Sequence, residues 1–181
     1  MEQRLPRRRK MRLPEYDYSS AGYYFITICT KDKRCFFGKI VGRADSGAPH
    51  PQPASPEKAM RLTAPQFQPT PIGKIVEKYI QSIDQAYSSV SLDQYVIMPN
   101  HIHMILRVAY PEDGAPGSSR PTNISGVIGC LKRFTNRDAG ENLWQSSYYD
   151  HIIRNEADYL RIWTYIENNP AEWGEDPYFE A

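Results

Sequence analysis

The chain has few cysteines, no long apolar run and almost no net charge. Its three cysteines, among 181 residues, are odd in number and lack metal-site spacing, so no disulfide framework is expected and a reducing cytoplasm fits. No apolar run approaches the length that crosses a bilayer, so no membrane partner is expected. A formal net charge of +1 gives, by itself, no argument for a polyanionic partner.

The basic residues are nevertheless concentrated at the beginning of the chain. Opposed only by Glu2, they are Arg4, Arg7, Arg8, Arg9, Lys10 and Arg12. Such a run is either a solvated tail or an arm that binds nucleic-acid phosphates. It is not a secretory signal, because no apolar stretch follows it before Tyr23. We therefore treat residues 1–20 as a basic N-terminal arm.

Length and composition predict one compact domain. A chain of 181 residues with 40% hydrophobic and 24% charged residues is long enough and apolar enough to bury a core. The prolines are unevenly spread, and seven of the 15 lie at positions 49, 51, 53, 56, 65, 69 and 71. They predict an extended insertion at about residues 43–71. We expect a single domain at 21–174, followed by a tail at 175–181.

The most informative segment is 95–108, an apolar, β-branched run that contains two histidines. In a strand, His101, His103 and Ile105 share one face, and the alternate positions share the other. One face is then core, whereas the other carries two imidazoles side by side, which suits a divalent metal bound by neutral ring nitrogens. The alternative is a pair of surface histidines on a half-exposed strand.

Hydrophobic periodicity and the positions of capping and turn residues predict the remaining helices and strands. Strands are expected at 23–30, 36–41, 90–98 and 147–150, and helices at 72–83, from 123 onward, and at 155–170. This order is an α+β pattern of the ferredoxin-like or RRM-like kind, an antiparallel sheet with helices on one face. The last helix can then pack toward the other face, where the two imidazoles lie.

The last helix separates its residues by direction. At about 100° per residue, the apolar stripe lies within about 60° of Tyr159 and consists of Ile162, Trp163 and Ile166. Tyr165 lies about 120° from Tyr159, and Asn169 lies only about 40° from Tyr165. A phenol and a carboxamide therefore project from the same side of the helix, outside the apolar stripe. Pro170 disfavours helical backbone at Asn169, so the final half-turn is expected to be bent.

These residues resemble a known family. His101-Ile102-His103 resembles the HUH motif of single-strand DNA nucleases, and 165–169, Tyr-Ile-Glu-Asn-Asn, resembles the tyrosine helix of single-tyrosine HUH transposases. More narrowly, five segments are similar to REP-associated tyrosine transposases: 12–18, 98–103, 143–145, 149–154 and 165–170. The resemblance extends from about residue 12 to residue 173, interrupted by the proline-rich insertion. It implies an HUH transposase domain with a catalytic helix that approaches the histidine strand.

The resemblance also implies a mechanism. Tyr165 would attack the scissile phosphate, forming a 5′-phosphotyrosine and freeing a 3′-hydroxyl, and another strand could then be joined to the intermediate. A divalent ion, Mg²⁺ or Mn²⁺, would be held by His101, His103 and the amide oxygen of Asn169. His151 is an alternative to Asn169 as the third ligand.

The implied partner is single-stranded DNA, in particular a hairpin of the repetitive extragenic palindromic (REP) type. The arginines and the lysine of the N-terminal arm would hold hairpin phosphates. Lys132 and Arg133, on the polar side of the middle helix, are further candidates for DNA binding, although they also fit simple solubility. We expect a cytoplasmic, nucleoid-associated protein, and the sequence leaves monomer and dimer open.

Two other functions fit the same elements. One is a domain that only binds single-stranded nucleic acid, which has no need of His101, His103 and Asn169 and for which the sequence lacks an RNP1-like aromatic pattern. The other is a metal phosphodiesterase that uses water, for which Tyr165 would be dispensable.

Overall fold

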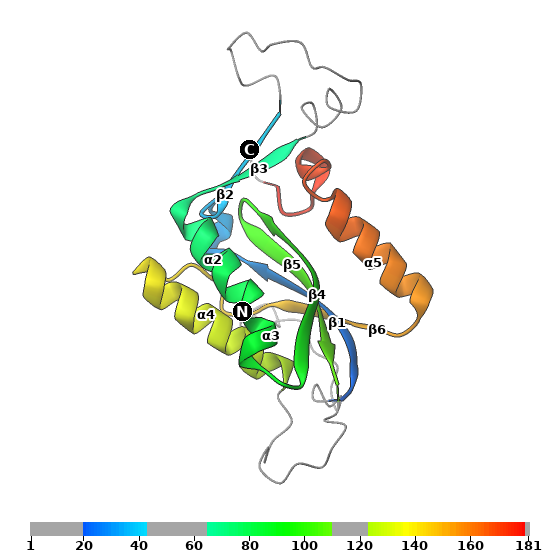
Figure 1. Cartoon of the computed structure of the whole chain (residues 1–181). Coiled ribbons are helices and arrows are strands. Elements are labelled where there is room, and N and C mark those ends of the chain that lie inside the picture. The colour runs from blue at the N-terminus through cyan, green and yellow to red at the C-terminus, as the bar shows by residue number, and fades with distance from the viewer. Residues whose placement is uncertain (1–19, 43–64, 110–122, 180–181) are drawn as a thin grey trace, which may run out of the picture.

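The computed structural model describes residues 20–42, 65–109 and 123–179 (Figure 1). Its main sheet has four strands in the order β4-β5-β1-β6, and each neighbouring pair is antiparallel. The elements in chain order are β1 (Gly22–Cys29), η1 (Lys31–Lys33), β2 (Gly38–Val41), β3 (Gln66–Pro69), α2 (Pro71–Gln81), α3 (Ile83–Ala86), β4 (Val90–Met98), β5 (His101–Val108), α4 (Ile124–Ala139), β6 (Tyr149–Ile153), α5 (Glu156–Asn168) and η3 (Trp173–Glu175).

The helices lie on both faces of the sheet in unequal numbers. The helices α2, α3 and α4 cover one face, while α5 lies alone on the other (Figure 1). The larger core, between the sheet and the first three helices, includes Ile26, Met104, Val76 and Ile128, all buried. A smaller core lies under α5. The predicted α+β architecture, with a separate helix approaching the histidine strand, is confirmed.

Local signals explain where the longer helices begin and end. The side chain of Asn123 accepts a hydrogen bond from the Gly126 amide at 2.7 Å, which satisfies one free N–H at the start of α4. Helix α4 ends at Gly140, whose φ of 74° is a left-handed conformation that glycine adopts without steric cost. Asn155 caps α5 by accepting from the Asp158 amide at 2.8 Å. Both helices therefore begin within one residue of the positions that the sequence predicts, 123 and 155.

Two expectations about the short strands differ from the structure. The strand expected at 36–41 does not join the main antiparallel sheet, because it forms β2, which pairs with β3 in a separate two-stranded sheet. The end of the proline-rich insertion therefore forms β3, in which Phe67 packs against the larger core. Prolines are tolerated here because an edge strand of a two-stranded sheet leaves half its N–H groups unpaired. Residues 43–64 of the insertion and 1–19 of the basic arm lie outside the described residues.

The expected tail at 175–181 is also not a separate segment. Asp176 is only 8% exposed, and the Tyr178 ring lies against His101 of the histidine strand, with centroids 4.8 Å apart. This contact could not be predicted from periodicity, because the segment contains only a single turn of 3-10 helix. Among the described helices, none combines the length and the apolar character needed to cross a membrane.

Candidate active site

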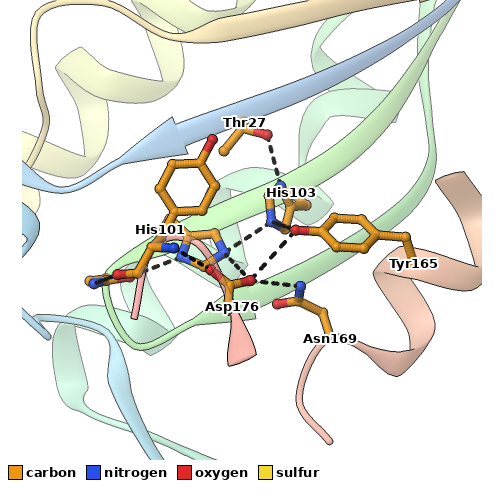
Figure 2. A network of polar contacts seen from close by, with 8 residues as sticks. Thr27, His101, His103, Tyr165, Asn169 and Asp176 are labelled. Atoms are coloured by element: carbon orange, nitrogen blue, oxygen red, sulfur yellow. Dashed lines mark hydrogen bonds and ion pairs between the residues drawn. The ribbon is translucent and has the colours of Figure 1, made fainter. Parts of the chain in front are cut away.

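The two histidines of β5 lie side by side, as the alternation of the strand predicts. Their Nε2 atoms are 2.9 Å apart (Figure 2). His101 is 0% exposed and His103 is 1% exposed, whereas the sequence predicted a more open face. Helix α5 and the segment 173–179 cover this face, so the imidazoles form a buried pair and the alternative of surface histidines is wrong.

Helix α5 brings the two predicted side chains to the histidines. The Tyr165 hydroxyl lies 3.2 Å from Nε2 of His103, and the tyrosine ring packs edge-on against Phe25. Asn169 is 1% exposed and keeps right-handed helical backbone, φ −52° and ψ −41°, so Pro170 does not bend the helix before this residue. The predicted grouping of Tyr165 and Asn169 beside His103 is therefore present in the structure.

Asp176 completes the cluster and was not predicted. Its Oδ2 accepts a hydrogen bond from Nδ2 of Asn169 at 2.9 Å and lies 3.8 Å from Nε2 of His101 (Figure 2). The same oxygen is 3.5 Å from the Tyr165 hydroxyl. The only hint in the sequence is an acidic residue among aromatic ones, Trp173 and Tyr178, near the end of the chain.

Burial sets the charge state of the cluster. Desolvation lowers the pKa of His101 to about 4, against the opposing effect of Asp176. Desolvation and the neighbouring His101 hold the pKa of His103 well below its usual value. Both imidazoles are therefore neutral near pH 7, which is the form that binds a metal. Burial and the Asp176 charge raise the pKa of Tyr165 to about 12, so its phenol is protonated.

The donor set of this cluster fits a divalent cation. The ligand atoms of His101, His103 and Asp176 all lie within 4.8 Å of one another. Oδ1 of Asn169 is buried and has no hydrogen-bond partner among the described residues, which is costly unless a ligand pairs with it. Two imidazole nitrogens, a carboxylate and an amide oxygen together match the ligands of Mn²⁺ or Mg²⁺.

The alternative third histidine lies elsewhere. Nε2 of His151 is 2.7 Å from Oδ2 of Asp158, whose other oxygen binds Arg161 at 2.6 Å. In the sheet register, His151 is paired with Phe25 on the opposite side of β1 from β5. The structure therefore does not bring His151 into the cluster, which contains Asn169 and Asp176 instead.

The candidate DNA-binding residues are also apart from the cluster. Lys132 donates to the carbonyl oxygens of Gln145 and Ser147 at 2.8 and 2.9 Å, so its ammonium holds the loop before β6. Arg133 is exposed and stacks on the Phe134 ring, on the helix that covers the other sheet face. Arg4, Arg7, Arg8, Arg9, Lys10 and Arg12 lie outside the described residues.

Comparisons with known proteins find relatives of this chain in sequence and in fold. No family model matches the chain. An uncharacterized protein of Haemophilus influenzae is 32% identical over 189 residues, which cover 95% of this chain and 93% of that protein. The REP-associated tyrosine transposase of Escherichia coli K12 is 34% identical over 83 residues, 46% of each chain.

A solved structure shares the architecture. It is described as a REP-associated tyrosine transposase bound to a REP hairpin, and it aligns with a TM-score of 0.53 at 18% identity, over 90% of this chain and 75% of that chain. At this identity the likeness shows the fold alone. The partial sequence match to the Escherichia coli protein, together with the histidine pair of β5 and the tyrosine helix α5, identifies the chain as a relative of the REP-associated tyrosine transposases.

Proposed function

We propose that the protein cleaves and rejoins single-stranded DNA at REP-type hairpins, using Tyr165 as nucleophile and a divalent metal. The observation that carries the proposal is the convergence of the Tyr165 hydroxyl on two neutral imidazoles and Asp176 in one buried cluster. The family of the chain and the hairpin named in the solved transposase support the substrate. A chromosomal substrate would place the protein in the cytoplasm, at the nucleoid.

Four residues would hold the metal. His101 and His103 would bind through Nε2, Asp176 through its carboxylate and Asn169 through Oδ1, which extends the set expected from the sequence by Asp176. Imidazole ligands favour Mn²⁺ over Mg²⁺. A bound ion would polarise the scissile phosphate and offset the negative charge that develops on its oxygens.

Tyr165 would carry the covalent step. Its oxygen attacks phosphorus, the bond from phosphorus to the 3′-oxygen breaks, and the leaving oxygen takes up a proton as the phenol loses one. With a pKa of about 12 the phenol is protonated near pH 7 and must pass its proton to an acceptor during the attack. The phosphodiester energy is kept in the phosphotyrosine, so the 3′-hydroxyl of another strand can reverse the step and join DNA without ATP.

The burial of the cluster sets a condition for substrate access. His101, His103 and Asn169 are at most 1% exposed, and rings of Trp173 and Tyr178 lie 6.0 and 4.8 Å from the His101 ring. A DNA phosphate therefore reaches the imidazoles only when the segment 173–179 shifts. Few regular hydrogen bonds hold this segment, since its only regular element is η3.

Two labels on one oligonucleotide test the proposal. The protein is incubated with Mn²⁺ and a single-stranded hairpin taken from palindromes that flank its gene, labelled at the 5′ end in one sample and at the 3′ end in the other. We expect the 3′ label in a protein adduct that survives SDS and the 5′ label in a free fragment with a 3′-hydroxyl. Cleavage without an adduct would indicate a water-using phosphodiesterase, and binding without cleavage a non-catalytic domain.

Removal of residues 1–10 is expected to weaken hairpin binding and flatten its salt dependence. This deletion removes Arg4, Arg7, Arg8, Arg9 and Lys10. If all of them contact duplex phosphates, the slope of log affinity against log salt falls in magnitude by up to about 4.5. Fluorescence anisotropy at several salt concentrations measures both the affinity and its salt slope. Lys74→Ser, at an exposed position of α2, is the control. An unchanged affinity and slope would show that the arm is only solvated.

A further inference from the structure

Asn100 makes contacts that the proposed mechanism does not use. This residue lies in the tight turn between β4 and β5 and is 0% exposed. Its Oδ1 is 2.9 Å from Nδ1 of His101, and its Nδ2 donates to the backbone carbonyl of Tyr178 at 2.8 Å. One carboxamide therefore contacts a candidate metal ligand and the segment that covers it.

The carbonyl of Tyr178 fixes the orientation of this carboxamide. A carbonyl oxygen only accepts hydrogen bonds, so the NH₂ group of Asn100 must face Tyr178 and its oxygen must face His101. An amide oxygen cannot donate, so the 2.9 Å contact requires the proton on Nδ1 of His101. A neutral imidazole has one N–H, and Nε2 of His101 is then a lone pair aimed at His103 and Asp176.

On its outer side His103 has no comparable restraint, and in the metal-free protein its Nε2 donates the hydrogen bond to the unprotonated Nε2 of His101. Its Nδ1 lies 2.8 Å from Oγ1 of Thr27, and a hydroxyl can rotate to donate or to accept. Thr27 is therefore compatible with either tautomer of His103. Among the outer partners of the two imidazoles, Asn100 alone dictates where the proton sits.

We propose that Asn100 is a positioning residue for the metal site, because its amide oxygen keeps His101 in the tautomer that leaves Nε2 free for a divalent cation. The inference rests on the proposed metal site and goes beyond it. Without this acceptor, a buried Nδ1–H would be unsatisfied, and the proton would gain a partner by moving to Nε2, where Nε2 of His103 can accept it at 2.9 Å. That tautomer blocks the metal-facing lone pair.

Long-range ¹H–¹⁵N correlation spectra of the metal-free protein test the tautomer directly. His101→Gln identifies the signals of His101 among the four histidines. We expect the Nδ1–H form in the wild type and in Asn100→Asp, whose carboxylate still accepts, and the Nε2–H form in Asn100→Leu. An Nε2–H signal from His101 in the wild type would overturn the proposal without any variant being needed.

Mn²⁺ binding, followed by the EPR signal of the free ion, gives the second measurement. We expect Asn100→Leu to bind about 10- to 100-fold more weakly than the wild type and Asn100→Asp to bind within a few fold of it. Equal loss in both variants would mean that Asn100 only supports the turn. A wild type that binds no Mn²⁺ although His101 is in the Nδ1–H form would overturn the metal site itself, and the proposal with it.

Discussion

Tyr165→Phe is expected to abolish both the covalent adduct and the release of a 3′-hydroxyl fragment, lowering the cleavage rate by at least about 10³-fold. The substitution removes one oxygen, which is the atom proposed to attack phosphorus. That oxygen lies 3.2 Å from Nε2 of His103 and 3.5 Å from Oδ2 of Asp176. Gel electrophoresis in SDS with labelled hairpin DNA measures the loss.

The variant should still fold and bind DNA. The Tyr165 side chain is half-buried, and its ring contacts with Phe25 and His103 remain in phenylalanine. Loss of one hydrogen-bonding oxygen at such a position costs about 1 kcal/mol of unfolding free energy. Normal hairpin binding together with absent cleavage would therefore locate the defect in chemistry.

Tyr159→Phe is the matched control, because it removes the same atom from the same helix. The Tyr159 hydroxyl donates to Asp93 at 2.6 Å, on an exposed part of β4, and does not contact the cluster. We expect cleavage close to that of the wild type. If Tyr165→Phe kept its adduct and Tyr178→Phe lost it, the nucleophile would be Tyr178, whose ring lies 4.8 Å from that of His101.

Much of the site could be predicted because it lies on regular elements. The alternation of β5 places His101 and His103 on one face, and the angular spacing of α5 separates Tyr165 from the buried Ile162 and Ile166. Each of these predictions uses a repeat of 2 or 3.6 residues that the backbone imposes. Asn169 follows from the same helix geometry.

The missed features lie where the backbone has no repeat. Asp176 belongs to an irregular segment, so no sequence spacing relates it to His101, 75 residues earlier. Strands β2 and β3 are separated by residues 42–65, so no sequence repeat relates the two partners. Lys132 was placed on the polar side of its helix as a candidate for DNA binding, but its ammonium donates to the Gln145 carbonyl. The helix pattern does not predict this contact, because a long side chain can reach carbonyls that are remote in sequence.

His101→Ala and His103→Ala are each expected to abolish metal-dependent cleavage while hairpin binding remains measurable. Each removes an Nε2 atom that lies 2.9 Å from Nε2 of the other imidazole and is proposed to bind the metal. Loss of a residue that only hydrogen-bonds a metal ligand typically lowers metal affinity by about 10- to 100-fold. Loss of one of the two nitrogen ligands should cost more, so we expect affinity for Mn²⁺ to fall by at least about 100-fold. Calorimetric titration with Mn²⁺ and cleavage after EDTA treatment, with and without added Mn²⁺, measure both effects.

His151→Ala is the control for loss of an imidazole as such. It breaks the 2.7 Å contact with Asp158, which is separate from the cluster, and should leave Mn²⁺ affinity and cleavage within a few fold of the wild type. EDTA should abolish cleavage by the wild type. Added Mn²⁺ should restore cleavage by the wild type but not by His101→Ala or His103→Ala. Full cleavage by either variant in the presence of EDTA would show that the histidine pair holds no catalytic ion, and the buried imidazoles would then need a role in shaping the pocket around Tyr165.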